Sequence, residues 1–220
     1  MSAKDYLDKL YRETNNITAA IKKYYHDENN FYDCVLIGVR ISDKRKLCTV
    51  CRQRLESYIK QDLFNTADCG AFLCVLGYND SSVKNSFHDR FYELCEKYLI
   101  EYDKNNPHCI RWCISICYML GELKNDIYWY KRCLIYDFTK FHPTILTKQL
   151  SACKIIAMRE PELTVRTCEY GLSLVDKMKD YDFTKIWGKS DIRYGTGYKE
   201  ISEVLRLAYE LSEMLNKKKV

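Results

Sequence analysis

The sequence predicts an all-α protein, an antiparallel array of about eight or nine helices. Three observations support this fold class. The 220 residues include only three prolines and eight glycines, so few positions interrupt regular structure. Apolar residues recur every three or four positions, which is the spacing of one helix face. No segment shows the alternation of apolar and polar residues that is typical of a half-buried strand.

Two prolines mark helix starts in the C-terminal third. Pro143 and Pro161 each precede an amphipathic segment, and proline suits the first turn of a helix because its missing N–H needs no partner there. We expect these helices to pack antiparallel across a turn of about three residues. Their apolar faces are Leu146, Leu150, Cys153 and Ala157, and Val165, Cys168, Leu172 and Val175. The last helix has its expected buried side at Ile201, Val204, Leu205, Ala208, Leu211 and Leu215.

Further helical patterns lie upstream. They cover residues 3–14, 16–28, about 30–60, 84–103 and 108–135. The sequence Asp-Lys-Asn-Asn-Pro at 103–107 is typical of a helix end followed by a new start. Residues 63–82 and 180–197 have the least regular patterns and contain glycines, and we expect a long loop in the second of them. We expect one domain over residues 1–220.

Charge and hydropathy favour a cytoplasmic protein that binds neither nucleic acid nor a membrane. The net charge of +5 is modest, and basic residues alternate with acidic ones except in the run Lys217–Lys219. No apolar run approaches the ~20 residues of a membrane span. The N-terminal sequence MSAKDYLDKLY is charged from its start, unlike a secretory signal.

The twelve cysteines predict buried free thiols rather than disulfides or a metal site. Cys109, Cys113 and Cys117 recur every four residues, on one helix face. Cys48 and Cys51 form the only C-x-x-C, and the histidines are too scattered to complete a zinc site. Because the sequence also lacks motifs such as H-E-x-x-H and G-x-S-x-G, we expect no metal, no cofactor and no enzymatic activity. We interpret His142 as a cap or surface residue.

Several short motifs follow one another in order over residues 94–215. LCEKYLIE at 94–101 is similar to Leu-Leu-Glu-Lys-Phe-Leu-Ile-Pro of the 14-3-3 family, and NDIYWYKRCL at 125–134 is similar to the family's Gly-Asp-Tyr-Tyr-Arg-Tyr-Leu. His-Pro at 142–143, Pro-Glu at 161–162 and Tyr-Lys-Glu at 198–200 match the starts of three later helices. Only twelve residues separate Tyr130 from Pro143, where the family has a further helix. Either a helix is missing here or the register differs.

The resemblance implies a curved stack of antiparallel helices. Its N-terminal helices, about residues 3–60, would form a homodimer interface and the floor of a concave groove, and residues 84–215 would form the walls. The groove would bind a phosphoserine or phosphothreonine peptide of a partner protein in extended form. Lysine and arginine would hold the phosphate by charge-assisted hydrogen bonds, and asparagine amides would hold the peptide backbone.

The family's groove residues fall on positions that retain its chemistry only in part. The resemblance implies as binding residues Arg40, Lys44, Trp129, Tyr130, Arg132, Leu150, Ser151, Lys154, Leu207 and Leu211. Lys60 is an alternative for one of the first two cations. The family's adjacent arginine and tyrosine fall either on Trp129 and Tyr130 or, after a slip of three residues, on Arg132 and Cys133. Its two clamp asparagines fall on Ser151 and Leu211.

These departures predict weakened or abolished phosphopeptide binding. Each lost hydrogen bond costs about 0.5–1.5 kcal/mol, and more where a charge is involved. The aromatic cluster of Tyr128, Trp129 and Tyr130 fits either core packing or the wall of a peptide site. The alternative function is a helical-repeat scaffold of the tetratricopeptide type that binds unmodified partner segments. The sequence lacks the repeat of about 34 residues that is usual in such arrays.

Overall fold

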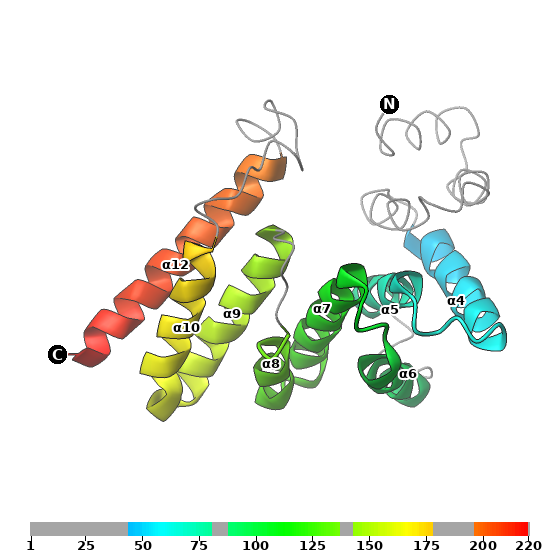
Figure 1. Ribbon diagram of the computed structural model, residues 1–220, viewed down its shortest axis with the longest axis horizontal. Helices are drawn as coiled ribbons and strands as arrows, with labels where there is room; N and C mark the ends of the chain where they lie inside the picture. The colour runs from blue at the N-terminus through cyan, green and yellow to red at the C-terminus, as the bar shows by residue number, and fades with distance from the viewer. Residues whose placement is uncertain (1–43, 81–87, 137–142, 178–195, 220) are drawn as a thin grey trace. The chain divides into compact units, whose positions relative to one another are not determined.

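The computed structural model describes residues 44–80, 88–136, 143–177 and 196–219 (Figure 1). These residues form an all-α array without strands, so the predicted fold class is confirmed for this part of the chain. The chain divides into two compact units, Met1–Ile116 and Cys117–Val220, and each is described by itself. The helices expected over residues 3–14 and 16–28, and the expected site residue Arg40, lie outside the described residues.

The first unit contains α4 (Lys44–Lys60), α5 (Ala67–Asn79), α6 (His88–Glu101) and the first part of α7 (Pro107–Lys124). Helix α5 packs against both α4 and α6. The core of the first unit includes Phe72, Leu76, Phe91 and Tyr98, which are fully buried. The predicted helix end and restart before Pro107 are confirmed, because α7 begins at that proline.

Helix α5 was not expected, since its residues lie in the segment 63–82 that the sequence pattern marks as irregular. That prediction is wrong. Every residue from Cys69 to Gly77 is buried, so the helix is apolar on all sides and has no polar face. A helix without a polar face lacks the period of 3.6 residues that identifies amphipathic helices. The two glycines within it, at 70 and 77, added to the irregular appearance of the segment.

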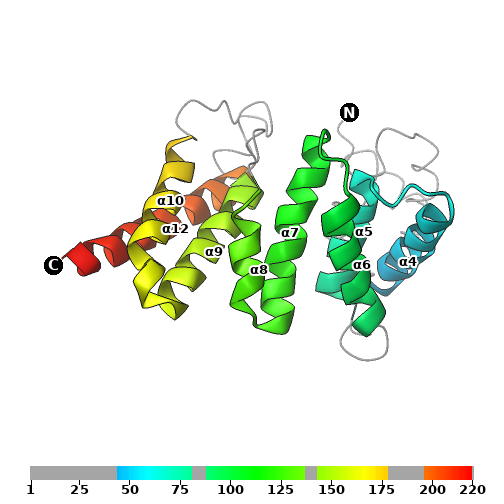
Figure 2. The ribbon, with the colours of Figure 1, turned by 60° about the horizontal axis from the view of Figure 1, so that its bottom comes forward.

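The described residues of the second unit form the end of α7 and four further α-helices. These are α8 (Ile127–Cys133), α9 (Pro143–Arg159), α10 (Thr164–Asp176) and α12 (Thr196–Lys219), with the 3-10 helix η2 (Pro161–Leu163) before α10. In both Figure 1 and Figure 2, α9 lies between α8 and α10. Helices α9, α10 and α12 all pack against one another. Their shared core comprises Leu146, Leu150, Cys153, Ala157, Cys168, Leu174, Val204, Leu207, Leu211 and Leu215.

The two proline-initiated helices are confirmed and are antiparallel. Helix α9 begins at Pro143, and Pro161 begins η2, which leads directly into α10. The Thr164 hydroxyl at the start of α10 donates to the carbonyl of Ala157, near the end of α9, at 3.0 Å. Two turns further along α10, Gly171 lies against Cys153, earlier in α9. Helices α9 and α10 therefore run antiparallel to each other.

The segment 108–135 was expected as one helix, but it forms α7 and α8. The break lies at Asn125, whose φ of 51° is in the left-handed region that asparagine tolerates better than most residues. Asp126 then caps α8, since its carboxylate accepts a hydrogen bond from the Tyr128 N–H at 2.9 Å. Arg159 at the end of α9 donates to the Asn125 carbonyl at 3.1 Å. Apolar spacing alone carries no signal of this break.

The predicted buried faces are correct in most positions. Leu146, Leu150, Cys153 and Ala157 of α9 are all buried. In α12, Val204, Leu211 and Leu215 are buried, but Leu205 is 58% exposed, contrary to the prediction. Leu205 follows Val204 directly, and a step of one residue turns a side chain about 100° around the helix axis. Val165 in α10 is also exposed, because the buried residues of this helix are Thr164, Thr167, Cys168, Gly171 and Leu174.

Gly70 in α5 is a position of the first unit where a side chain has no room. A Cβ atom there would lie 2.5 Å from the Cβ of Trp112 and 2.6 Å from the hydroxyl oxygen of Tyr98. Gly70→Ala should therefore lower the free energy of unfolding by about 1–3 kcal/mol, although alanine has the higher helix propensity. Urea denaturation followed by circular dichroism measures the change. The control is Glu93→Ala at an exposed position of α6, and a midpoint as high for Gly70→Ala as for the control would contradict the close packing.

Candidate functional site

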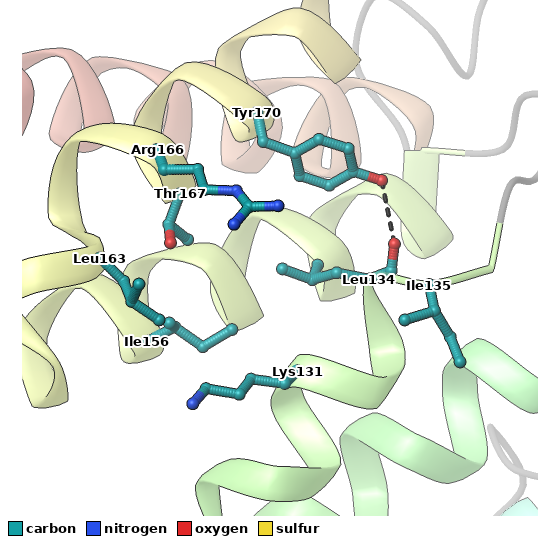
Figure 3. A pocket seen from close by; sticks show the side chains of 8 residues that line it. All are labelled: Lys131, Leu134, Ile135, Ile156, Leu163, Arg166, Thr167 and Tyr170. Carbon is teal, nitrogen blue, oxygen red and sulfur yellow. Dashed lines mark hydrogen bonds between the residues drawn. The ribbon is translucent and has the colours of Figure 1, made fainter.

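The second unit has a surface pocket where α8, α9 and α10 meet (Figure 3). Its volume is about 350 Å³. The lining residues are Lys131, Leu134, Ile135, Ile156, Leu163, Arg166, Thr167 and Tyr170. Mostly apolar walls with a few polar groups are typical of ligand-binding pockets.

A second buried stripe on α9 contributes one residue, Ile156, to the pocket. Ile145, Gln149, Ala152 and Ile156 follow one another at spacings of four, three and four residues, and all are buried. This stripe lies beside the one that faces the shared core, so α9 is covered over more than one face. Ile156 is only 2% exposed and forms part of the pocket, whereas Ile135 is 72% exposed and lies at its rim.

Hydrogen bonds from α9 and α10 hold the end of α8 in place. The buried Gln149 amide donates to the carbonyl of Tyr136 at 3.1 Å and to that of Cys133 at 3.5 Å. The Tyr170 hydroxyl donates to the Leu134 carbonyl at 3.1 Å, as Figure 3 shows. Carbonyl groups at a helix C-terminus have no partner within the helix, so these side chains satisfy them. The same bonds position Leu134 and Ile135 at the pocket.

The two cations of the pocket differ in their surroundings. The ammonium of Lys131 lies 2.6 Å from a carboxylate oxygen of Glu160, in an ion pair. Arg166 is exposed, and among the described residues it has neither an ion pair nor a hydrogen bond through its side chain. Figure 3 shows its guanidinium directed toward the middle of the pocket. The pocket therefore offers one cation that forms no ion pair with another side chain of the described residues.

The leucines that the 14-3-3 resemblance places at a groove lie in the core of the second unit. Leu150, Leu207 and Leu211 are buried among α9, α10 and α12. In this structure they are covered by neighbouring helices and line no open groove. Ser151, the neighbour of Leu150, is half-buried and forms a side-chain hydrogen bond with Tyr118 of α7.

Lys154 is also engaged within the protein. Its ammonium lies 2.9 Å from a carboxylate oxygen of Glu210 on α12. The interaction with Lys154 is the main reason why the pKa of Glu210 is lowered. Arg206 pairs with the same Glu210 and, at 2.6 Å, with Glu203. The charge of Lys154 is thus already compensated.

The aromatic cluster on α8 is largely a packing feature. Trp129 and Tyr130 are each only 4% exposed, which confirms the core-packing interpretation for these two residues. Two cations lie over the Trp129 ring, Lys124 at 5.2 Å and Arg132 at 5.6 Å from its centroid. Arg132 also donates to the Tyr128 hydroxyl at 3.3 Å. Such cation–π contacts occupy the guanidinium that the resemblance assigns to a phosphate.

The remaining expected cations belong to the first unit. Lys44 is the first residue of α4, and Lys60, the alternative, is its exposed last residue. Arg132 and Lys154 belong to the second unit. The pocket residues Ile156, Arg166 and Tyr170 were missed by the sequence analysis. The spacing of the second α9 stripe could have indicated Ile156, but an exposed arginine on a polar helix face gives no comparable signal.

The described cysteines are buried free thiols, as predicted. All eleven are buried, including Cys109, Cys113 and Cys117 on α7 and the Cys48–Cys51 pair on α4. Burial raises the pKa of Cys69 and of Cys153 to about 12, so both are thiols at neutral pH. Within the described ranges, no three His, Cys, Asp or Glu side chains gather in a way that could hold a metal ion. The same ranges contain no helix with the length and apolar character to cross a membrane.

No protein-family model, no curated protein and no solved structure significantly matches this chain. The resemblance to 14-3-3 proteins therefore stays a prediction from the sequence.

Gln149 should be important for the stability of the second unit. In Gln149→Met the side chain keeps a similar volume but donates no hydrogen bond, which leaves the carbonyls of Cys133 and Tyr136 without this partner. We expect the free energy of unfolding to fall by about 1–3 kcal/mol. Urea denaturation measures the loss, with the exposed Gln53→Met as the matched control. Equal midpoints for the two variants would show that the bonds to α8 contribute nothing measurable.

The buried thiols predict a loss of stability at alkaline pH. An unfolded cysteine ionises near its usual pKa of 9.0, whereas Cys153 in the fold stays protonated up to about 12. The unfolded state therefore loses protons first, so the contribution of this thiol is fully present below pH 9.0 and is lost as the pH rises toward about 12. The urea midpoint should fall over this interval, and it should fall less in Cys153→Ala. The same fall in both proteins would contradict this assignment.

Proposed function

We propose that this protein is a non-catalytic adaptor that binds a segment of a partner protein in the pocket formed by α8, α9 and α10. The observation that carries the proposal is the pocket itself, an apolar cavity of about 350 Å³ with an exposed arginine and a tyrosine at its edge. Arginine and tyrosine are among the residues that are enriched where proteins bind one another tightly.

The rim of the pocket supports a polypeptide ligand. Ile135 exposes 72% of its surface directly beside the cavity, and Tyr170 is also exposed. An apolar side chain of a partner could fill the cavity, while the neighbouring residues of the same segment cover Ile135 and Tyr170. A small molecule confined to the cavity would leave these rim residues in water. The hydrogen-bonded end of α8 keeps the wall in place without a ligand, which lowers the cost of binding.

The charges of the second unit favour an unmodified segment over a phosphorylated one. A phosphorylated side chain carries about −1.5 to −2 charges at neutral pH and is held by clusters of cations. Here Lys131 and Lys154 are each paired with a glutamate, and Arg132 lies over Trp129. This supports the scaffold alternative for the ligand. Phosphate-dependent binding that is lost in Arg132→Ala would instead support a function of the 14-3-3 type.

Ile135→Asp should abolish binding without unfolding the protein. The carboxylate would stand at the rim of an apolar cavity, and the exposed position makes the substitution harmless to the fold. Selection of short random peptides displayed on phage against the wild-type protein should enrich a set of binders. We expect these peptides to bind Ile135→Asp at least about tenfold more weakly in fluorescence polarisation, a difference of about 1.4 kcal/mol.

The matched control is Leu205→Asp, which introduces the same charge at an exposed leucine of α12 outside the pocket. It should bind the peptides as the wild type does. Equal binding to both variants would place the site elsewhere on the protein. A selection that enriches no peptide on the wild type would contradict the proposed function.

A further inference from the structure

We infer that the pocket recognises a partner segment in which an aspartate or glutamate stands beside a large apolar residue, with Arg166 binding the carboxylate. This inference rests on the proposed function and names the chemistry of its ligand. It follows from the charge of the pocket, the direction of the Arg166 side chain and the apolar walls around it.

The charge of the pocket matches a ligand group with one negative charge. Two cations line it, Lys131 and Arg166, and one of them is paired with Glu160 at 2.6 Å. Lys131, Arg166 and Glu160 together carry a net charge of +1. Glu162 in η2 and Glu169 in α10, the acids nearest to Arg166 in the sequence, are exposed, and Arg166 forms no ion pair among the described residues. One carboxylate would bring the net charge of Lys131, Arg166 and Glu160 to zero, whereas a phosphate dianion would make it negative.

The guanidinium group also has the right shape for this ligand. Its planar arrangement of N–H donors binds both oxygens of a carboxylate at once, which a lysine ammonium cannot do. Figure 3 shows it above a space bordered by Leu134 and Ile156. Beside these apolar side chains, water is partly excluded and a charge-assisted hydrogen bond is stronger than on an open surface. The same side chains provide the contact for the apolar residue of the ligand.

The open rim favours a side-chain carboxylate within a segment over the carboxylate at a chain end. Ile135 and Tyr170 are exposed at the pocket, so a chain can enter and leave across them. The open rim leaves room for the chain to continue on both sides of the bound acidic residue. The synthetic peptides for the test are therefore acetylated and amidated at their ends, which leaves side chains as the only source of carboxylate.

A double-mutant cycle tests the inference. Peptides enriched on the wild-type protein are synthesised with each acidic residue intact or changed to its amide, and their affinities for wild type, Arg166→Ala and Arg166→Lys are measured by fluorescence polarisation. The amide should weaken binding to the wild type about tenfold, as expected for the loss of a charge-assisted pair. In Arg166→Ala, the change from acid to amide should leave the affinity unaltered. In Arg166→Lys, the same change should weaken binding, but by less than in the wild type.

Lys218→Ala is the control for charge, because it removes one positive charge from an exposed position of α12 outside the pocket. It should bind like the wild type. Enriched peptides without an acidic residue, or an amide effect that is equal in wild type and Arg166→Ala, would overturn the inference and leave the proposed function intact. So would a phosphoserine analogue that binds at least about tenfold more tightly than the carboxylate. If no peptide is enriched, the proposed function fails and the inference fails with it.

Discussion

The hydrogen bonds that close the C-terminal end of α8 fix the geometry on which the pocket depends. Gln149 of α9 and Tyr170 of α10 donate to the carbonyls of Tyr136 and Leu134 at the same distance of 3.1 Å. Because Gln149 and Tyr136 are buried, the Tyr136 carbonyl has no ready supply of water without this bond, and losing the bond costs more than it would at the surface. The bonds tie α8 to both neighbouring helices and place Leu134 and Ile135 beside Ile156. The same side chains that bind the free carbonyl groups at the end of α8 therefore also fix one wall of the pocket.

Helix α9 contributes both to the core of the second unit and to the pocket, through different residues. One of its buried stripes belongs to the core with α10 and α12, and the other reaches from Gln149 to the pocket at Ile156. The charged side chains around α9 are mostly paired within the protein, as in Lys154 with Glu210. The pocket adds exposed groups to this frame, Arg166 and Ile135, which contribute little to the core. The residues that we propose for partner recognition are therefore ones that contribute little to the core.

The sequence allowed the fold class and most of the C-terminal unit to be predicted, because Pro143 and Pro161 start helices and apolar spacing marks their buried faces. The prediction failed at α5, because a helix that is apolar on all sides shows no 3.6-residue repeat of apolar positions. It also failed at Asn125, where one residue in the left-handed conformation separates α7 from α8. The site was harder to predict for a physical reason. Apolar periodicity reports which residues are buried, so Leu150 and Leu211 were found but belong to the core. Whether an exposed arginine such as Arg166 is paired depends on side chains that are distant in sequence.

The most direct test of this account is to observe where a selected peptide touches the protein. Isoleucine methyl groups are labelled with ¹³C, and their NMR signals are followed as the peptide is added. Binding in the proposed pocket should shift the signals of Ile135 and Ile156 and leave those of Ile100 on α6 and Ile201 on α12 unchanged. Shifts at Ile100 or Ile201, with those of Ile135 and Ile156 unaffected, would show that the partner binds another surface and would contradict the account.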